Sequence, residues 1–286
     1  MSVVYLNGEF MPAEKATVSV FDRGFLLGDG VYEVIPAFSG CLFRLTEHLE
    51  RLQNSLDAIR LENPFSSDQW EDMLKQLIAE NMSPELSIYL QVTRGVAVRD
   101  HAFPADAKPS IFAMANPIQK LAESYFKNGV GAITAVDNRW QRCNIKAISL
   151  LPNVLLRQQA VEQGVAEAIL IRDGNVTEGS ASNVFVVFNG KILTPPKGQY
   201  ILPGITRDLV LELANVNNME CGEETITQDM LFSADEVWLT SSTKEVLSVT
   251  KIDDKPVGQG KPGPVWQRMV DIYREYKNSL LEQPRC

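Results

Sequence analysis

The sequence is poor in the residues that build metal sites and disulfide frameworks. It holds only 2 histidines, and its 4 cysteines, Cys41, Cys143, Cys221 and Cys286, lie far apart. Zinc sites and disulfide-stapled domains need such residues at close, repeated spacings. The sequence therefore indicates neither a metal site nor a disulfide framework.

Positive charge and long apolar runs are also scarce. Lysine and arginine number 27 against 36 aspartates and glutamates, a formal charge of -9. Nucleic acids and anionic membranes attract basic surfaces, so neither is expected as a partner, and an anionic ligand must be held by local cations. No run of about 18 apolar residues appears, and the first residues lack the features of a signal peptide. We therefore expect a soluble, cytoplasmic protein.

The length of 286 residues, with 45% hydrophobic content, favours two domains. Between Asn116 and Glu123 the composition turns polar, as is typical of a domain linker. We predict domains at residues 1–118 and 119–286. Two domains would also provide a cleft for a ligand.

The first half opens with recognisable local signals. Asn7-Gly8 predicts a tight β-hairpin turn. Residues 22–30 hold three glycines and lead into a strand at 31–35. A phosphate-binding P-loop is not indicated, because no lysine follows and the loop enters a strand. A glycine-rich loop that places Tyr32 at a cleft is the better interpretation.

A helix is predicted next, with Thr46 as its cap and an apolar face formed by Leu49, Leu52 and Leu56. Its other face carries His48 and Arg51, for which chemistry alone favours a solvated or structural role. A second helix is predicted over 67–81 and a strand over 86–93. The loop that follows holds Arg99 and His101, which chemistry alone would leave facing solvent.

The second half contains a lysine and a glutamate of possible catalytic value. Lys146 precedes the mostly apolar residues 147–151, where a desolvated ammonium would lose its proton more easily and become a nucleophile. Such a lysine often forms a Schiff base with a carbonyl substrate or with pyridoxal phosphate, whose pyridine nitrogen needs an acidic partner such as Glu178. In the competing interpretation, Lys146 simply extends its ammonium to the surface, and the Thr-Glu-Gly that contains Glu178 is only a turn.

Several elements surround this pair. A strand is predicted over 129–136, a helix over 152–163, and hairpin turns at Asp173-Gly174 and Asn189-Gly190. Ile205 and Thr206 begin another predicted helix, which is either simply capped or forms an anion site.

A strand near Glu236 then leads into a hydroxyl-rich turn with Ser242 and Thr243. A terminal helix is predicted over 262–281.

Four phrases together resemble one enzyme family. They are Asp22-Arg-Gly with Gly28-Asp-Gly, Lys146 with the residues up to Asn153, Thr177-Glu-Gly-Ser, and Gly204-Ile-Thr-Arg. The set is similar to the fold type IV pyridoxal-phosphate enzymes, which include D-amino acid aminotransferases, branched-chain aminotransferases and aminodeoxychorismate lyase. The resemblance covers Asp22 to Val246.

The resemblance implies an α+β fold, with a small N-terminal α/β domain and a larger C-terminal domain built on a barrel-like mixed sheet with flanking helices. It implies pyridoxal 5'-phosphate as the cofactor, Lys146 as the catalytic residue and Glu178 at the pyridine nitrogen. The remaining cofactor contacts implied are to the phosphate, from Arg51, Ile205, Thr206, Ser242 and Thr243.

The resemblance also implies the substrate contacts. Arg99 and His101 match the Arg-x-His loop that binds the substrate α-carboxylate in D-amino acid aminotransferases, with Tyr32 beside it. In that subfamily the loop reaches in from the partner subunit, which implies a homodimer with a shared active site. Amino acids and 2-oxo acids are the implied substrates.

Two features favour the D-amino acid subfamily. Leu151 stands where branched-chain enzymes have a tyrosine, and those enzymes lack the Arg-x-His loop. The lyase is disfavoured because its residues after the lysine are more polar. We therefore expect ping-pong transamination of D-alanine and 2-oxoglutarate to pyruvate and D-glutamate. Ala181 departs from the serine that close relatives often have. The alternative outside the enzymes is a non-catalytic protein that binds phosphate.

Overall fold

The computed structural model describes residues 2–281, which divide into two compact units. Unit 1 holds residues up to 119 together with 145–150, and unit 2 holds 120–144 and the chain from 151 onward. Both units combine helices with a sheet, as the α+β prediction requires. Within residues 2–281, no helix is both long enough and apolar enough to cross a membrane.

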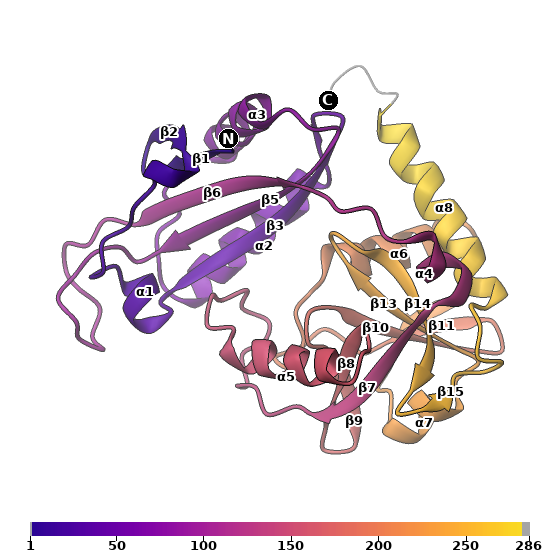
Figure 1. Ribbon diagram of the computed structural model, residues 1–286. Helices are drawn as coiled ribbons and strands as arrows, with labels where there is room; N and C mark the ends of the chain where they lie inside the picture. Colours follow the sequence, from indigo (N-terminus) through magenta and orange to yellow (C-terminus); the bar gives the residue numbers. More distant parts are fainter. Residues whose placement is uncertain (1, 282–286) are drawn as a thin grey trace. The chain divides into compact units, whose positions relative to one another are not determined.

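Unit 1 is built on a six-stranded antiparallel sheet in the order β2-β1-β6-β5-β3-β4 (Figure 1). The strands are β1 (Val3–Leu6), β2 (Glu9–Pro12), β3 (Gly30–Phe38), β4 (Cys41–Leu42), β5 (Glu85–Thr93) and β6 (Ser110–Pro117). The helices are η1 (Ala13–Lys15), α1 (Arg23–Leu27), α2 (Leu45–Ala58) and α3 (Ser67–Asn81). Helix α2 packs on β3, and α3 packs on β1 and β6, which encloses one apolar core.

Local sequence explains much of unit 1. Asn7 and Gly8 both have positive φ, at 50° and 104°, so the predicted hairpin turn is confirmed. Helix α3 has the predicted bounds and begins with a capping box between Ser66 and Gln69. The predicted apolar face of α2 is buried, as Leu49, Leu52 and Leu56 all belong to the core.

Two local predictions in unit 1 were wrong. The glycine-rich stretch is not a simple loop, because Asp22 accepts a hydrogen bond from the Gly24 amide and starts α1. Thr46 does not cap α2, which begins at Leu45 after Arg44 in the left-handed region, at φ 56°. Asp22 is a favoured N-cap residue, and it was missed because the glycines of this stretch indicated a loop.

Unit 2 contains a nine-stranded mixed sheet in the order β12-β11-β10-β13-β14-β7-β8-β9, with β15 paired to β14. The strands are β7 (Val130–Val136), β8 (Glu167–Arg172), β9 (Asn175–Gly179), β10 (Asn183–Phe188), β11 (Lys191–Thr194), β12 (Cys221–Glu223), β13 (Glu236–Ser241), β14 (Glu245–Ile252) and β15 (Lys255–Pro256). The helices are α4 (Glu123–Asn128), α5 (Leu151–Glu162), α6 (Ile205–Val216), α7 (Gln228–Ser233) and α8 (Pro264–Leu281).

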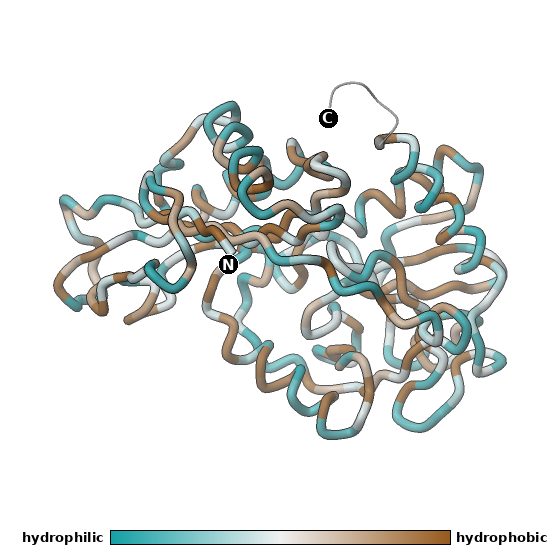
Figure 2. Tube along the Cα trace, turned by 45° about the horizontal axis from the view of Figure 1, so that its top comes forward, coloured by the Kyte–Doolittle hydropathy of each residue, from teal (hydrophilic) through white to brown (hydrophobic). Residues whose placement is uncertain are grey.

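The sheet of unit 2 curls into a barrel-like layer (Figure 1), as the resemblance implies. Its central strands carry the apolar core, and Figure 2 shows them as largely hydrophobic. The hairpin turns predicted at Asp173-Gly174 and Asn189-Gly190 are confirmed by positive φ at all four residues.

The segment 145–150 belongs to unit 1, although the predicted single boundary assigns it to the second domain. Its backbone pairs with β3, since Tyr32 N donates to Lys146 O at 2.9 Å and Ile148 N donates to Gly30 O at 3.1 Å. Ile145 lies in the unit 1 core. Pairing with a strand more than a hundred positions earlier in the sequence therefore places the lysine segment in unit 1.

Candidate active site

The predicted site residues are distributed over both units. Unit 1 carries Tyr32, Arg51, Arg99, His101 and Lys146. Unit 2 carries Glu178, Ile205, Thr206, Ser242 and Thr243.

Lys146 is half-buried and held through its backbone on both sides. Its carbonyl accepts from Tyr32 N, and its amide donates to Ser55 Oγ at 3.2 Å. Its ammonium nitrogen lies 4.1 Å from the centroid of the Tyr32 ring, a cation–π distance. The structure thus brings Tyr32 and Lys146 together and fixes the direction of the lysine.

A buried carboxylate orients Arg51. Glu33 is fully buried on β3 and accepts from Arg51 Nε and Nη2, each at 2.8 Å. His48 Nδ1 lies 2.8 Å from the same carboxylate. Burial alone would raise the pKa of Glu33, but Arg51 and His48 bring it far below its usual range, so Glu33 is ionised. The structural role predicted for His48 is confirmed, and phosphate binding by Arg51 stays a prediction.

Burial lowers the pKa of His48, whereas it raises that of a carboxyl group such as Glu33. Desolvation is the largest influence and lowers the pKa of His48; Glu33 raises it, the charges of Arg51 and Lys146 lower it, and the net effect is a lowered pKa. The imidazole is therefore neutral near pH 7. A neutral His48 adds no positive charge beside Lys146.

Tyr32 lies on β3 beside the lysine segment and stacks with Tyr89 at 5.6 Å between ring centroids. Burial raises the pKa of Tyr89 to about 12, and the Tyr89 hydroxyl donates to Gln91 Oε1 at 2.6 Å. The Tyr89 side chain therefore remains neutral and packs against the Tyr32 ring.

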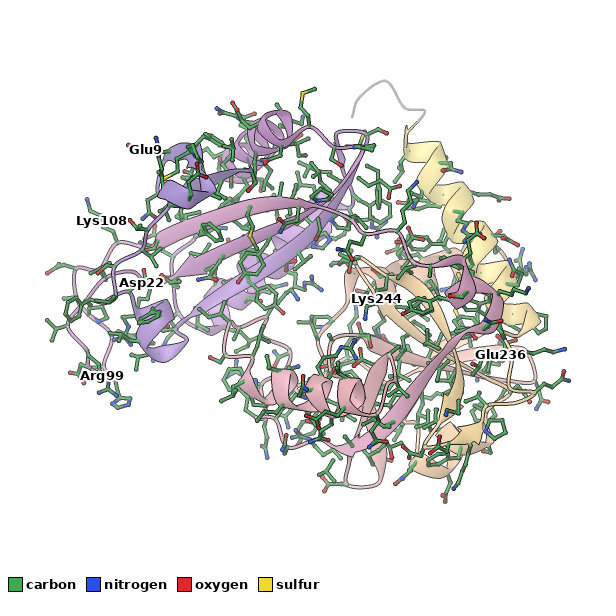
Figure 3. The ribbon with its side chains drawn as sticks, viewed as in Figure 1. Glu9, Asp22, Arg99, Lys108, Glu236 and Lys244 are labelled. Atoms are coloured by element: carbon green, nitrogen blue, oxygen red, sulfur yellow. The ribbon has the colours of Figure 1, made fainter. Side chains whose placement is uncertain are left out.

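The loop between β5 and β6 carries Arg99 and His101, and both side chains are exposed. Figure 3 shows Arg99 at the outer end of this loop, directed away from the sheet of unit 1. Their exposure agrees with the solvent-facing placement that chemistry alone favoured.

In unit 2, Glu178 is a buried carboxyl with three donors. Arg139 Nη1 donates to Oε1 at 2.5 Å, while Asn183 Nδ2 and Leu202 N donate to Oε2 at 3.2 and 3.0 Å. Burial raises the pKa of Glu178 to about 7 even though Arg139 and the Leu202 amide lower it. Glu178 therefore changes its protonation near neutral pH and is sensitive to any further donor.

Sequence reasoning missed the network behind Glu178. Asp137 binds Arg139 through two hydrogen bonds, from Nε at 2.9 Å and Nη2 at 3.0 Å, and also accepts from Thr177 Oγ1 at 2.8 Å. Arg172 adds an ion pair to Asp137 at 3.0 Å. Burial would raise the pKa of Asp137, but Arg139 and the other partners lower it to about 2. The sequence held one signal for this network: Asp137 and Arg139 follow directly after the strand predicted over 129–136.

The start of α6 has the form of an anion site. Gly204 is its N-cap and offers no side-chain cap, and a Cβ there would lie 1.9 Å from Asn183 Oδ1. Ile205 and Thr206 form the first turn and are both buried. Across the sheet, Thr240 pairs with Asn183, and its hydroxyl is buried without a hydrogen-bond partner among the described residues.

Ser242 and Thr243 follow β13 in a half-buried turn. The structure assigns neither of them a hydrogen-bond partner within residues 2–281. Their phosphate contacts stay predictions.

The comparisons with known proteins identify the family. The family model for "Amino-transferase class IV" matches residues 30–252. The chain belongs to this family. Among class IV relatives, D-alanine aminotransferase of Bacillus licheniformis is 45% identical over 280 residues, 98% of each chain. D-alanine aminotransferase of Staphylococcus haemolyticus is 41% identical over 280 residues, 98% of this chain and 99% of that protein.

Solved structures agree with the class IV assignment. The branched-chain amino acid aminotransferase of Escherichia coli has a TM-score of 0.89 at 27% identity, covering 96% of this chain and 94% of the other. A T.th. branched-chain amino acid aminotransferase, solved with pyridoxamine 5'-phosphate, has a TM-score of 0.89 at 30% identity, covering 96% and 93%. The fold predicted from the resemblance is therefore confirmed.

Proposed function

We propose that this class IV aminotransferase transfers an amino group from D-alanine to 2-oxoglutarate, giving pyruvate and D-glutamate. The similarity to D-alanine aminotransferases over 98% of the chain, at 45% and 41% identity, carries the proposal. Leu151, in place of the tyrosine of branched-chain enzymes, and the Arg99-x-His101 loop support it further.

The residues of unit 2 fit pyridoxal 5'-phosphate. A phosphate suits a helix N-terminus that has no side-chain cap, and α6 provides one near the Thr240 hydroxyl, which lacks a hydrogen-bond partner in the described part of the chain. A pyridine N–H suits a buried carboxyl whose pKa lies near neutrality, as at Glu178. We expect Ile205 and Thr206 to hold the phosphate, together with Arg51, Ser242 and Thr243.

When bound, the cofactor supplies an electron-withdrawing ring that makes the Cα–H of an amino acid acidic. Lys146 would hold the cofactor through its aldehyde. Lys146 Nζ would also be the group that takes the proton from the substrate Cα and later returns a proton. The backbone bonds of Lys146 to Tyr32 N and Ser55 Oγ limit the positions that Nζ can sample.

Glu178 would serve the same chemistry by accepting a hydrogen bond from the ring nitrogen. Arg139 and the Leu202 amide fix its two oxygens, so the carboxyl does not need to reorient. An added N–H donor would lower the pKa of Glu178 from about 7 and keep the carboxylate ionised.

Arg99, His101 and Tyr32 are proposed to bind the substrate α-carboxylate. An arginine binds a carboxylate through two parallel hydrogen bonds, and the exposure of Arg99 and His101 makes them available to a second subunit. A homodimer with a shared active site and a cytoplasmic location are part of this proposal.

The test is a coupled assay of the purified protein with 2-oxoglutarate as acceptor. D-alanine should be turned over, and L-leucine, the control donor, should not. Turnover of L-leucine alone would favour the branched-chain activity of the solved relatives and refute the carboxylate-loop assignment. A bound cofactor without turnover of either donor would point to the lyase, and no bound cofactor would favour the phosphate-binding alternative.

A further inference from the structure

The loop that joins β5 to β6 spans residues 94–109 and contains no helix or strand. Connections of this length are uncommon, and they are mobile unless other groups restrain them. The loop carries Arg99 and His101, whose use as carboxylate ligands would require a fixed position. Restraint of this loop therefore bears directly on substrate binding.

The segment Asp22–Gly30, whose glycines suggested a loop, lies against this connection. Backbone hydrogen bonds join this segment and the preceding Phe21 to the first residues of the loop: Arg23 N donates to Gly95 O at 2.9 Å, and Ala97 N donates to Phe21 O at 3.2 Å. Gly24 allows the close approach, because a Cβ there would lie 2.3 Å from Thr93 Cγ2. The segment is thus a support for the loop.

Arg23 reaches from this support to the outer part of the loop. Its side chain is buried, and Nε donates to Asp29 Oδ2 at 2.8 Å. Its Nη1 donates to Asp100 O at 2.7 Å and to Ala102 O at 3.2 Å. These two carbonyls lie on either side of His101, and Asp100 directly follows Arg99. One guanidinium therefore fixes the backbone at both predicted carboxylate ligands.

A second arginine shares the same carboxylate. Arg94 donates to Asp29 from Nε at 2.8 Å and from Nη2 at 3.1 Å. Its guanidinium carbon lies 3.7 Å from the centroid of the Phe103 ring. Burial would raise the pKa of Asp29, but Arg94 and Arg23 bring it below its usual range, so the carboxylate is ionised. Asp29 thus joins Arg23 to Arg94.

Asp22 restrains the returning end of the loop. Its Oδ1 accepts from Gly24 N at 2.8 Å, and its Oδ2 accepts from Ser110 Oγ at 2.6 Å at the start of β6. Figure 3 shows Asp22 at the base of the loop and Arg99 at its outer end. The loop is therefore held at its entry, its middle and its exit by one short segment.

We infer that Arg23, anchored by Asp29, is a positioning residue that sets substrate affinity by holding Arg99 and His101 in place. The inference rests on the proposed function, because it assigns these two residues to substrate binding. Arg23 itself is buried and acts through the backbone of the loop. A purely structural role would instead change the stability of unit 1 without a specific effect on KM.

The experiment compares Arg23→Gln with Lys108→Gln. Lys108 is exposed at the end of the same loop (Figure 3), so its variant loses the same charge without breaking the restraint. Arg23→Lys keeps the charge but cannot reach Asp29 and both carbonyls, and it provides a second variant should Arg23→Gln fold poorly. Arg99→Ala and the double variant Arg23→Gln/Arg99→Ala complete the set.

Two measurements are made on each protein in its cofactor-bound form. Amide hydrogen exchange of residues 96–103 should accelerate about tenfold or more in Arg23→Gln, because loss of a single charged hydrogen bond accounts for about tenfold and Arg23 donates two to the loop. KM for D-alanine should rise about tenfold, with kcat and the cofactor spectrum nearly unchanged. Lys108→Gln should change neither. In the Arg99→Ala background, Arg23→Gln should raise KM by a smaller factor than in the wild type, because only His101 is then left for Arg23 to position.

Unchanged exchange in both Arg23 variants would overturn the restraint. A fall in kcat without a change in KM, or an equal rise in KM with and without Arg99, would overturn the link to substrate binding. Failure of the wild-type chain to use D-alanine would refute the proposed function and the substrate part of this inference, while exchange would still report on the restraint. The two failures are therefore distinguishable.

Discussion

Glu178 should make the cofactor-free chain less stable as pH rises. Burial raises its pKa in the folded chain to about 7, against an ordinary value of 4.5. Between these values the unfolded chain releases a proton that the folded chain retains, so raising pH favours unfolding. The destabilisation is absent below pH 4.5 and complete above pH 7.

The magnitude follows from the difference between the two pKa values. Each unit corresponds to about 1.4 kcal/mol, so ionisation of Glu178 lowers the free energy of unfolding by about 3 kcal/mol. The carboxyl is 5% exposed, so solvent screens this effect little. For a chain of this size the shift in Tm is about 5 °C.

The assay is thermal unfolding of the cofactor-free wild type and of Glu178→Gln at pH 5 and pH 8. The glutamine loses one hydrogen bond at both pH values, so only the change in the Tm difference with pH reports the ionisation. The Tm of Glu178→Gln minus the Tm of the wild type should be about 5 °C larger at pH 8 than at pH 5. Glu9→Gln, at an exposed position of β2 (Figure 3), is the control. Parallel pH profiles for wild type and Glu178→Gln would refute the assigned pKa.

Two further predictions concern packing and the last helix. Leu77→Ala, in the unit 1 core, should lower the free energy of unfolding by about 2–5 kcal/mol, whereas Met82→Ala at an exposed position should change it by less than about 0.5 kcal/mol, both measured by denaturant unfolding. Glu236→Gln should cost about 1–3 kcal/mol and speed proteolysis of α8, because its carboxylate accepts from Val265 N and Trp266 N at the start of that helix. Unchanged proteolysis would contradict this assignment of Glu236.

Elements specified by nearby residues could be predicted from the sequence. The turn at Asn7-Gly8 and the whole of α3 were found because φ preference and capping act over a few residues. The helix α6 was found from the loop at Pro203-Gly204 and the helical spacing of Leu209 and Leu213.

Features that depend on distant pairing could not be predicted. Residues 145–150 join unit 1 through hydrogen bonds to β3, which no local pattern announces. Helix α1 has a local cap at Asp22, but Gly24 lowers its helix propensity and the glycines of this stretch indicated a loop, and its backbone is held by hydrogen bonds to the distant β5–β6 connection. The dependence on distant partners also explains why no role was found for Arg23 and Asp29.

The residues of the candidate site also divide into those that the sequence indicated and those that it did not. Lys146 and Glu178 were proposed from their chemistry, and the family resemblance supplied their roles. The Glu33–Arg51 pair was missed because it joins residues of a strand and a helix that only the fold brings together. Asp137 and Arg139 are neighbours in the sequence, but the contact of Arg139 with Glu178 depends on the fold, so the role of the pair was missed as well. Buried charged side chains are usually paired with an opposite charge. Each buried charged residue of the site therefore required a partner, but the sequence did not show which residue that partner was.

The most direct test of the central claim is reduction of the purified, cofactor-bound protein with borohydride, followed by peptide mapping. Pyridoxal phosphate should become fixed to Lys146 in the wild type, and Lys146→Ala should carry no label. Label on another lysine, or none in a protein that turns over D-alanine, would contradict the role assigned to Lys146.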